Sequence, residues 1–300
     1  MLQRLNLLKR SFPHQLLATP FSTTPSTSPP TTSAEQEKII AELQIAFRTC
    51  YSEQNYTDAT ELALELDTIT EEFYGLDHPV TASSINNHAL LKRATGEYES
   101  AVQLFTTAIQ SYEKSVGKEH TSTATALHNL GLTYKSMYES DNFTSMETIN
   151  LQDRAEEALR ESMERRNPEH IDRATTMYIL ASVRNTQGNP EESHILFQDA
   201  VALLRDSYAQ SKENKTSGMR LATCINNYGF FLKNEEEDYN EALNKYQESY
   251  ELREKHSGVN DISTIISLQN IAELLTSMEQ EKEANIVREE IMKRVESLDK

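Results

Sequence analysis

Small and large apolar residues recur in a fixed register along most of the chain. The segment 81–89 (TASSINNHA) is matched 42 residues later by 123–131 (TATALHNLG), and 221–229 (LATCINNYG) is matched 43 residues later by 264–272 (TIISLQNIA). A weaker copy, RATTMYILA, occupies 173–181. Each copy predicts a helix, because no sustained β-branched run interrupts it, and one small residue recurs at the same helical position. These small residues are Ala89, Gly131, Ala181, Gly229 and Ala272.

A second helical segment follows each first one and carries its own small residue. The small residues of this second helix are Ala101, Ala155, Ser193, Ala242 and Ala284. A large apolar side chain stands four positions further on in the first four copies, at Phe105, Leu159, Phe197 and Tyr246, whereas the last copy has Arg288. Small residues let two antiparallel helices approach closely while larger apolar residues interlock around them, so the pattern predicts helical hairpins.

Turn signals separate the two helices of a hairpin, as at Gly96 and at Gly188 to Pro190. Glycine supplies the left-handed residue that ends one helix, and proline suits the first turn of the next. One hairpin cannot bury both of its faces, so neighbouring hairpins must stack. An insertion near 139–151 lengthens the third copy. We therefore expect an all-α array of about six antiparallel helix pairs, with approximate repeats 35–78, 79–120, 121–170, 171–218, 219–261 and 262–300.

These repeats resemble the kinesin-light-chain type of tetratricopeptide (TPR) repeat. The resemblance lies in residues 74–82 (YGLDHPVTA) and 85–89 (INNHA), with echoes at 117–124 (GKEHTSTA) and 167–170 (NPEH). It covers about residues 35 to 300 and implies an α-solenoid in the form of a right-handed TPR superhelix that binds proteins without catalysis. No heptad run is available for a coiled coil of the kind that attaches kinesin light chains to their motor. From this resemblance we therefore expect the fold of kinesin-light-chain repeats but not their role in motor transport.

In TPR superhelices the first helix of each repeat lines a concave groove that holds partner segments. The resemblance places amide and imidazole side chains there, at Asn86, Asn87, His128, Asn129, Asn226, Asn227 and Asn270. An amide can both donate to and accept from a peptide backbone. One turn further on stand Arg93, Lys135 and Lys233, which favour an acidic or carboxylate-bearing partner segment. The alternative is that the asparagines serve packing between repeats and the basic residues face water.

The first 34 residues differ from the rest. They contain Arg4, Lys9 and Arg10 but no acidic residue, an apolar stripe beside these charges, and a tail rich in Ser, Thr and Pro. This composition is typical of a mitochondrial transit peptide, and Arg10 and His14 interrupt any apolar run long enough for a secretory signal. The alternatives are a plastid address and a disordered tail. No stretch of about 18 apolar residues predicts a transmembrane helix.

The net charge is −18, and removing the three basic residues of the N-terminal segment takes it to −21. Such a surface repels phosphate backbones, so nucleic acid is not an expected partner. The two cysteines, Cys50 and Cys224, are far apart without CxxC spacing, which favours reduced thiols over a disulfide framework or metal site.

Motifs of catalytic or cofactor chemistry are absent from the sequence: there is no GxSxG elbow, no glycine-rich phosphate loop and no HExxH. His78 and His120 recur at one repeat position, which first suggests a ligand pair. Their place just ahead of a helix is better explained by loop packing or helix capping. We expect no enzyme activity, no cofactor and no metal.

Three functions are compatible with these features. The first is a mitochondrial scaffold for assembly or quality control that holds partner proteins in the groove. The second is a cytosolic cargo adaptor of the kinesin-light-chain kind. The third, an organellar RNA-binding helical-repeat protein, is disfavoured by the acidic charge.

Overall fold

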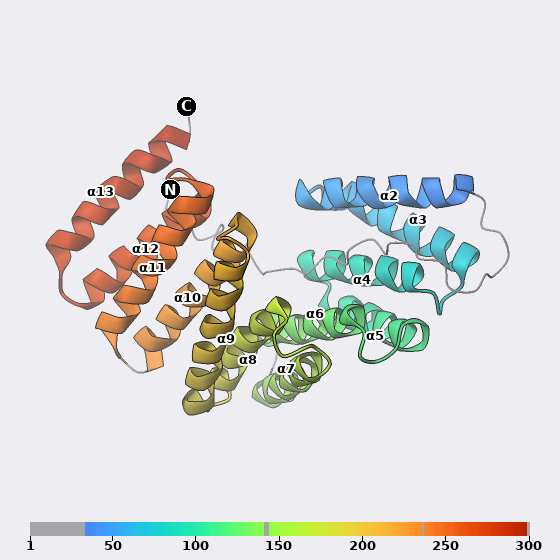
Figure 1. Ribbon diagram of the computed structural model, residues 1–300, viewed down its shortest axis with the longest axis horizontal. Coiled ribbons are helices and arrows are strands. Elements are labelled where there is room, and N and C mark those ends of the chain that lie inside the picture. Colours follow the sequence, from blue (N-terminus) through green and yellow to red (C-terminus); the bar gives the residue numbers. More distant parts are fainter. Residues whose placement is uncertain (1–33, 141–143, 236, 299–300) are drawn as a thin grey trace. The chain divides into compact units, whose positions relative to one another are not determined.

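A computed structural model describes residues 34–298 except 141–143 and 236. The predicted N-terminal address therefore lies, apart from Ala34, outside the described residues. Regular structure within these ranges is entirely α-helical (Figure 1). The helices are α2 (Ala34–Ser52), α3 (Tyr56–Tyr74), α4 (Pro79–Ala94), α5 (Tyr98–Ser115), α6 (Thr121–Tyr138), α7 (Ser145–Glu164), α8 (Ile171–Thr186), α9 (Pro190–Gln210), α10 (Lys215–Glu235), α11 (Tyr239–Ser257), α12 (Ile262–Ser277) and α13 (Glu281–Leu298).

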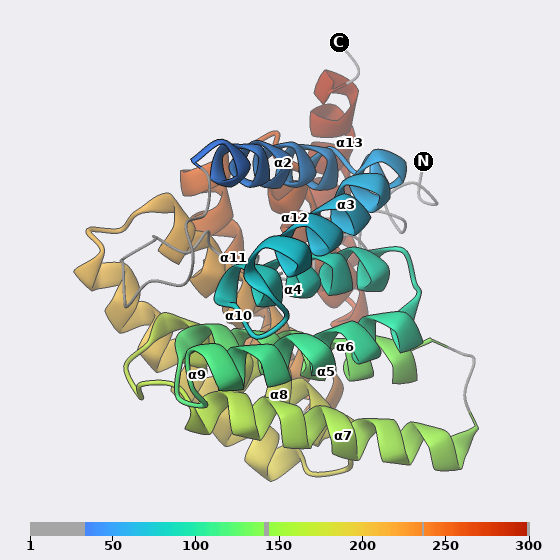
Figure 2. The same ribbon diagram turned by 90° about the vertical axis from the view of Figure 1, so that its right-hand side faces the viewer.

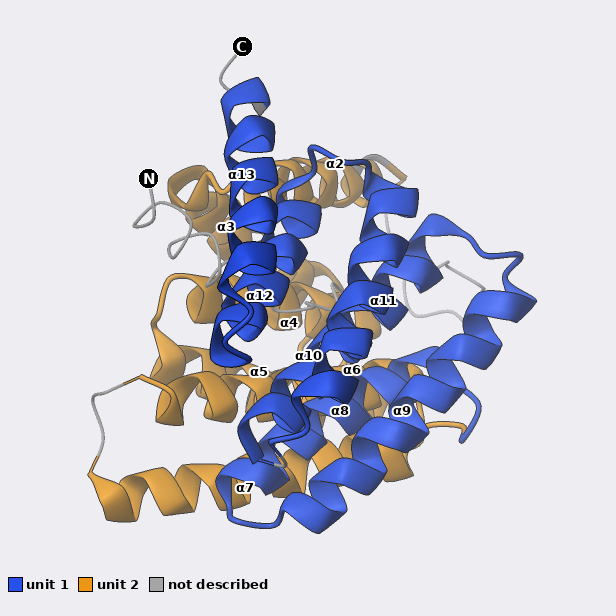
Figure 3. Ribbon diagram, turned by 90° about the vertical axis from the view of Figure 1, so that its left-hand side faces the viewer, with its two compact units in different colours: residues 1–13, 168–300 blue, residues 14–167 orange. Residues whose placement is uncertain are grey.

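The helices pack as successive pairs, α2 with α3 through α12 with α13. The predicted all-α fold of about six antiparallel helix pairs is confirmed. The chain divides into two compact units, with the boundary between Asn167 and Pro168 (Figure 3). The unit before the boundary, called here the N-unit, contains α2 to α7, which follow one another as a stack (Figure 2). The unit after it, the C-unit, contains α8 to α13.

The small residues predicted from the repeat lie where the two helices of a pair meet. Within the α4–α5 pair, Ala89, Leu90, Ala101 and Phe105 form one apolar cluster, and none of the four is exposed to solvent. In the α6–α7 pair, a Cβ built on Gly131 would come within 2.6 Å of the Leu159 Cγ atom. The structure also buries the other small residues at equivalent places: Ala155, Ala181, Gly229, Ala242, Ala272 and Ala284.

The loop before α4 explains the Gly-x-x-His-x-x-Thr part of the repeat. Gly75 has a φ of 84°, a left-handed value that favours glycine. His78 is the N-cap of α4, and the Val80 N–H donates to its Nδ1 atom at 3.3 Å. The Thr81 hydroxyl donates back to the Gly75 carbonyl oxygen at 2.9 Å. Gly, His and Thr at this spacing therefore close one turn and start the next helix.

The same loop recurs before α6. Gly117 has a φ of 95°, the His120 Nδ1 atom accepts from the Ser122 N–H, and the Thr123 hydroxyl donates to the Gly117 carbonyl oxygen at 2.9 Å. His170 caps α8 in the same way. The interpretation of His78 and His120 as capping residues is confirmed.

None of the helices within the described ranges is long and apolar enough to cross a bilayer.

Candidate functional site

The residues predicted to line a groove all lie on the first helices of their pairs. We call the face that they share the ladder face. It carries Asn86, Asn87, Leu90 and Arg93 on α4, and His128, Asn129, Leu132 and Lys135 on α6. In the C-unit it carries Asn226, Asn227, Phe230 and Lys233 on α10, and Gln269, Asn270 and Glu273 on α12. The structure thus places Arg93 and Lys135 in one unit and Lys233 in the other.

The ladder face of the N-unit is buried. Asn86 and Asn87 on α4, and His128 and Asn129 on α6, are all in the buried class. Both polar atoms of the Asn86 amide are buried without a hydrogen-bond partner among the described residues. A buried amide without partners is costly, because its hydrogen bonds to water have been lost and not replaced. These groups therefore lie inside the stacked helices and not on an open surface.

Arg93 is the most unusual residue of this face. Its side chain is only 5% exposed, and neither its Nε atom nor its two Nη atoms have an acceptor within the described ranges. Burial lowers the pKa of its guanidinium. Lys135, the equivalent residue one repeat later, instead forms an ion pair with Glu139 of its own helix. The two basic ladder-face residues of the N-unit are therefore chemically distinct, and of these two Arg93 is the one without a counter-charge among the described residues.

The ladder face of the C-unit is more open. Asn226, Asn227 and Asn270 are half-buried. The Asn270 Nδ2 atom donates to the Asn226 Oδ1 atom at 2.8 Å and so joins α12 to α10. This bond gives one polar atom of each amide a packing role, as the alternative interpretation of the asparagines expects. Phe230 is 61% exposed, and Lys233 beside it on α10 is half-buried.

Two serines that repeat seven positions after the small residue of the second helix have a role that the sequence did not reveal. The Ser162 hydroxyl donates to the Ala124 carbonyl oxygen at 2.7 Å, and the Ser249 hydroxyl donates to the Ala222 carbonyl oxygen at 2.8 Å. Both bonds join the two helices of one pair. The recurrence of a small hydroxyl residue at this position was the only available signal.

A cluster of Asp67, Ser84 and His88 joins α3 to α4 and superficially has the composition of a catalytic triad. The Ser84 hydroxyl donates to Asp67 Oδ1 at 2.6 Å, and His88 Nδ1 lies 2.7 Å from Asp67 Oδ2. The serine is thus bonded to the carboxylate and not to the imidazole, so no base is placed to take its proton. We interpret this cluster as a link between the two helices. Within the described ranges no three His, Cys, Asp or Glu side chains form a group that could hold a metal ion.

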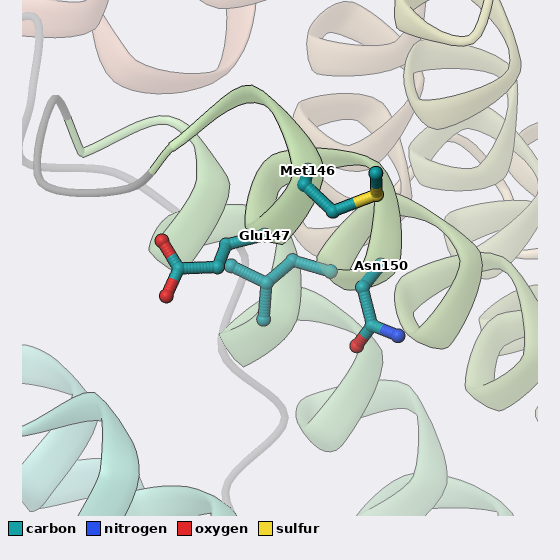
Figure 4. A pocket seen from close by; sticks show the side chains of 4 residues that line it. Met146, Glu147 and Asn150 are labelled. Atoms are coloured by element: carbon teal, nitrogen blue, oxygen red, sulfur yellow. The ribbon is translucent and has the colours of Figure 1, made fainter.

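Two surface cavities in the described part of the chain lie away from the ladder face. One, of about 350 Å³, is lined by α7 residues at the end of the insertion (Figure 4). Met146, which is 77% exposed, borders it with Glu147, Asn150 and Leu151. The other, of about 370 Å³, lies among α9, α10 and α11, where Arg205 is paired with Glu248 and Lys255 with Glu213. Neither cavity is lined by a ladder-face residue.

Comparisons with known proteins agree with the hairpin array. The family model described as tetratricopeptide repeat matches residues 48–114 and 83–140. No curated protein sequence matches the chain. Residues 48–140 therefore carry TPR repeats.

Solved structures with the same fold include kinesin-light-chain-like proteins. A kinesin light chain of Podospora anserina with nearly identical TPR-like repeats is 18% identical, with a TM-score of 0.53 over 74% of this chain and 97% of its own. BtubC (BKLC) from P. vanneervenii is 15% identical, with a TM-score of 0.59 over 89% of this chain and 93% of its own. IFIT1, solved with m7Gppp-AAAA, is 13% identical, with a TM-score of 0.53 over 82% of this chain and 53% of its own. These likenesses concern the fold alone.

Proposed function

We propose that this TPR chain is a non-catalytic scaffold that binds partner proteins through the ladder face of its repeats. The observation that carries the proposal is the open part of that face in the C-unit, where half-buried amides stand beside the exposed ring of Phe230 on α10. Amide side chains can donate to and accept from a protein backbone, which supplies both donors and acceptors. The partner segment is acidic or carboxylate-bearing, because the half-buried Lys233 lies beside Phe230 on this open part of the face.

The test is capture of partners by the full-length protein and by a double variant on the open part of the face, Asn227→Ala with Lys233→Glu. We expect the variant to lose at least about tenfold in affinity, since one charge-assisted hydrogen bond contributes about 1.5–3 kcal/mol. Co-purification followed by titration of a recovered partner measures this change. Asn150→Ala with Lys118→Glu is a matched control, because it makes the same chemical changes at exposed residues, on α7 and in the loop after α5. Equal capture by both variants, with helical content unchanged, would place binding elsewhere.

We further propose that the scaffold acts in mitochondria, in assembly or quality control of protein complexes. The support is the composition of residues 1–34, which are basic, rich in Ser and Thr, and free of acidic residues. A fusion of residues 1–34 to a fluorescent protein should therefore enter mitochondria, and the same fusion with Arg4, Lys9 and Arg10 changed to Gln should not. Cytosolic signal from the unchanged fusion would favour the alternative of a kinesin-light-chain-like cargo adaptor, whose fold this chain shares.

An RNA-binding role is the second alternative, because IFIT1, which has the same fold, was solved with a capped oligonucleotide. The acidic charge of the chain opposes it. Salt-sensitive RNA binding by the purified protein would decide in its favour.

A further inference from the structure

Helix α7 begins earlier in its repeat than the second helices of four other pairs do. In those pairs the second helix begins three residues before its small residue, at Tyr98, Pro190, Tyr239 and Glu281. Helix α7 begins at Ser145, ten residues before its small residue Ala155. The difference of seven residues is about two helical turns. The insertion predicted near 139–151 therefore lengthens α7 at its start.

The lengthened start of α7 presents two large apolar side chains to solvent. Met146 is 77% exposed and Ile149 is 55% exposed, and a cavity of about 350 Å³ borders Met146 (Figure 4). Their spacing of three residues places them on one side of the helix. Asp153 and Glu157, both exposed, continue this side at a spacing of four. We call these four residues the α7 stripe, which is apolar at its start and acidic further on.

The charge of the α7 stripe limits what can cover it. Arg154, which follows Asp153, has its guanidinium over the Tyr134 ring of α6, 5.8 Å from the ring centre, and so lies away from the stripe. A second copy of α7 would bring the same carboxylates face to face, and like charges oppose such a contact. An acidic segment, of the kind proposed for the ladder face, is disfavoured for the same reason. The occupant that fits is both apolar and basic.

Residues 2–12 of this chain, which precede the described residues, have this chemistry in their sequence. They contain three basic residues and no acidic one. Apolar residues recur among them at spacings of three or four: Leu2, Leu5, Leu8 and Phe12. A helix of this sequence has an apolar side flanked by positive charges, and Pro13 would end it. We propose that residues 2–12 dock on the α7 stripe, with their apolar side on Met146 and Ile149 and their basic residues near Asp153 and Glu157.

The chain between the two parts is long enough for this contact within one molecule. In the N-unit, α2 belongs to the first pair and α7 to the third. Helices of this length are about 30 Å long and pack at about 10 Å, so the starts of α2 and α7 lie within about 45 Å of each other. Residues 13–33 span about 70 Å when extended. A short peptide tether gives an effective concentration on the order of 1 mM, so even a weak contact is well populated.

Docking covers the segment that carries the predicted mitochondrial address. A chain whose N-unit has folded therefore withholds residues 2–12 from other binding partners until α7 releases them. This inference goes beyond the scaffold function, because the contact forms within one chain and can be tested without a partner protein or an organelle.

The experiment places the photoreactive amino acid benzoylphenylalanine at position 8 of the full-length protein, in place of Leu8. Irradiation at low micromolar concentration is followed by mass spectrometry of the digested protein, which maps the crosslink. We expect the main crosslink to join position 8 to residues 145–157 of the same chain. A main crosslink to any other part of the chain would overturn the docking.

Two double variants test whether the apolar side chains of the stripe make the contact. Met146→Asp with Ile149→Asp, the α7 variant, should lower the crosslink yield at least about threefold, because charged groups replace the apolar contact. Acidic residues are favourable near the start of a helix, so circular dichroism should show unchanged helical content. Ile39→Asp with Ile45→Asp, the α2 variant, makes the same changes at exposed residues nearer to the segment and should leave the yield unchanged. Equal yields in the two variants would overturn the docking.

The charge of the segment and the number of chains are tested in the same way. Changing Arg4, Lys9 and Arg10 to Gln should lower the yield about twofold or more, since exposed ion pairs contribute modestly. A mixture of ¹⁵N-labelled and unlabelled protein separates crosslinks within a chain from crosslinks between chains. A main crosslink between labelled and unlabelled chains would show that the segment docks on a second copy, and would overturn the contact within one chain.

A second measurement follows trypsin cleavage after Lys9 and Arg10 in the full-length protein without the photoreactive residue. A docked segment is cut slowly, because the protease acts on the released form. We expect cleavage to be about threefold faster in the α7 variant than in the unchanged protein, and unchanged in the α2 variant. Equal rates in all three proteins would overturn the docking.

Discussion

The two units have the same repeat but different ladder faces. At the position directly after the small residue of the first helix, the N-unit has Leu90, which is fully buried, and the C-unit has Phe230, which is 61% exposed. Four positions after the small residue, the side chain of Arg93 is only 5% exposed, whereas that of Lys233 is half-buried. The face where the helices of a pair pack shows no such contrast. Ser162 and Ser249 make the same bond to the partner helix in both units.

This difference shows which positions of the repeat stay alike in the two units and which positions differ between them. The packing face needs small residues at fixed places, because the two helices approach closely there. The ladder face has no such requirement, so a leucine in one unit can be a phenylalanine in the other. The packing face is therefore alike in the two units, and the ladder face is where they differ.

Substitution to alanine at the two equivalent ladder positions tests this contrast most strongly. Leu90→Ala should destabilise the protein by about 2–5 kcal/mol, because Leu90 packs with Ala101 and Phe105 and its loss leaves a cavity. Phe230→Ala removes a larger side chain but should cost at most about 0.5 kcal/mol, since most of the ring already faces solvent. Chemical denaturation followed by circular dichroism measures both. Similar costs for the two substitutions would mean that Phe230 is covered in solution and that the ladder faces do not differ in this way.

The sequence predicted the packing face well because the information there is periodic. Ala89, Gly131 and Gly229 recur at the repeat interval, and a helical period with small residues in register has few structural solutions. The capping role of His78 and His120 was predictable for the same reason, since each stands just ahead of a helix. His170 lacks the full motif around it, and its cap was found only in the structure.

The ladder face could not be predicted to the same depth, because its properties depend on contacts between different repeats. Leu90 and Phe230 occupy the same position in the pattern, and nothing local to either one reveals that the first is buried and the second exposed. Tyr51 lies 42 residues before Arg93, in the preceding pair. The charge of Arg93 affects the pKa of Tyr51 because α2 and α4 bring the two side chains near each other, which the sequence does not show. The amide ladder and its basic residues as a binding groove stay a prediction, and the sequence does not reveal that Arg93 is buried whereas Lys233 is half-buried.

Glycine at the small position of the first helix gives a finer comparison of the two units. A Cβ on Gly131 would lie 2.6 Å from Leu159 Cγ and 3.2 Å from the Ala155 carbonyl oxygen, whereas a Cβ on Gly229 would meet the Tyr246 ring at 3.1 Å. Gly131→Leu should therefore destabilise the N-unit by about 1–3 kcal/mol or more, because a large side chain enters a close helix contact.

Gly229→Ala should cost little in comparison. Shifts of a few tenths of an ångström by the Tyr246 ring and the Lys245 Cβ atom make room for the methyl group, and alanine gains up to about 1 kcal/mol of helix propensity over glycine. Gly131→Ala gains the same propensity but must displace Leu159, so it should be less stable than Gly229→Ala when the two are compared by thermal unfolding. Ala89 and Ala181 already occupy this position in other repeats, which shows that a methyl group fits where the facing side chain leaves room for it. If Gly131→Ala proved the more stable of the two variants, Leu159 would be free to move aside. The short distance to Leu159 would then not explain why glycine occupies position 131.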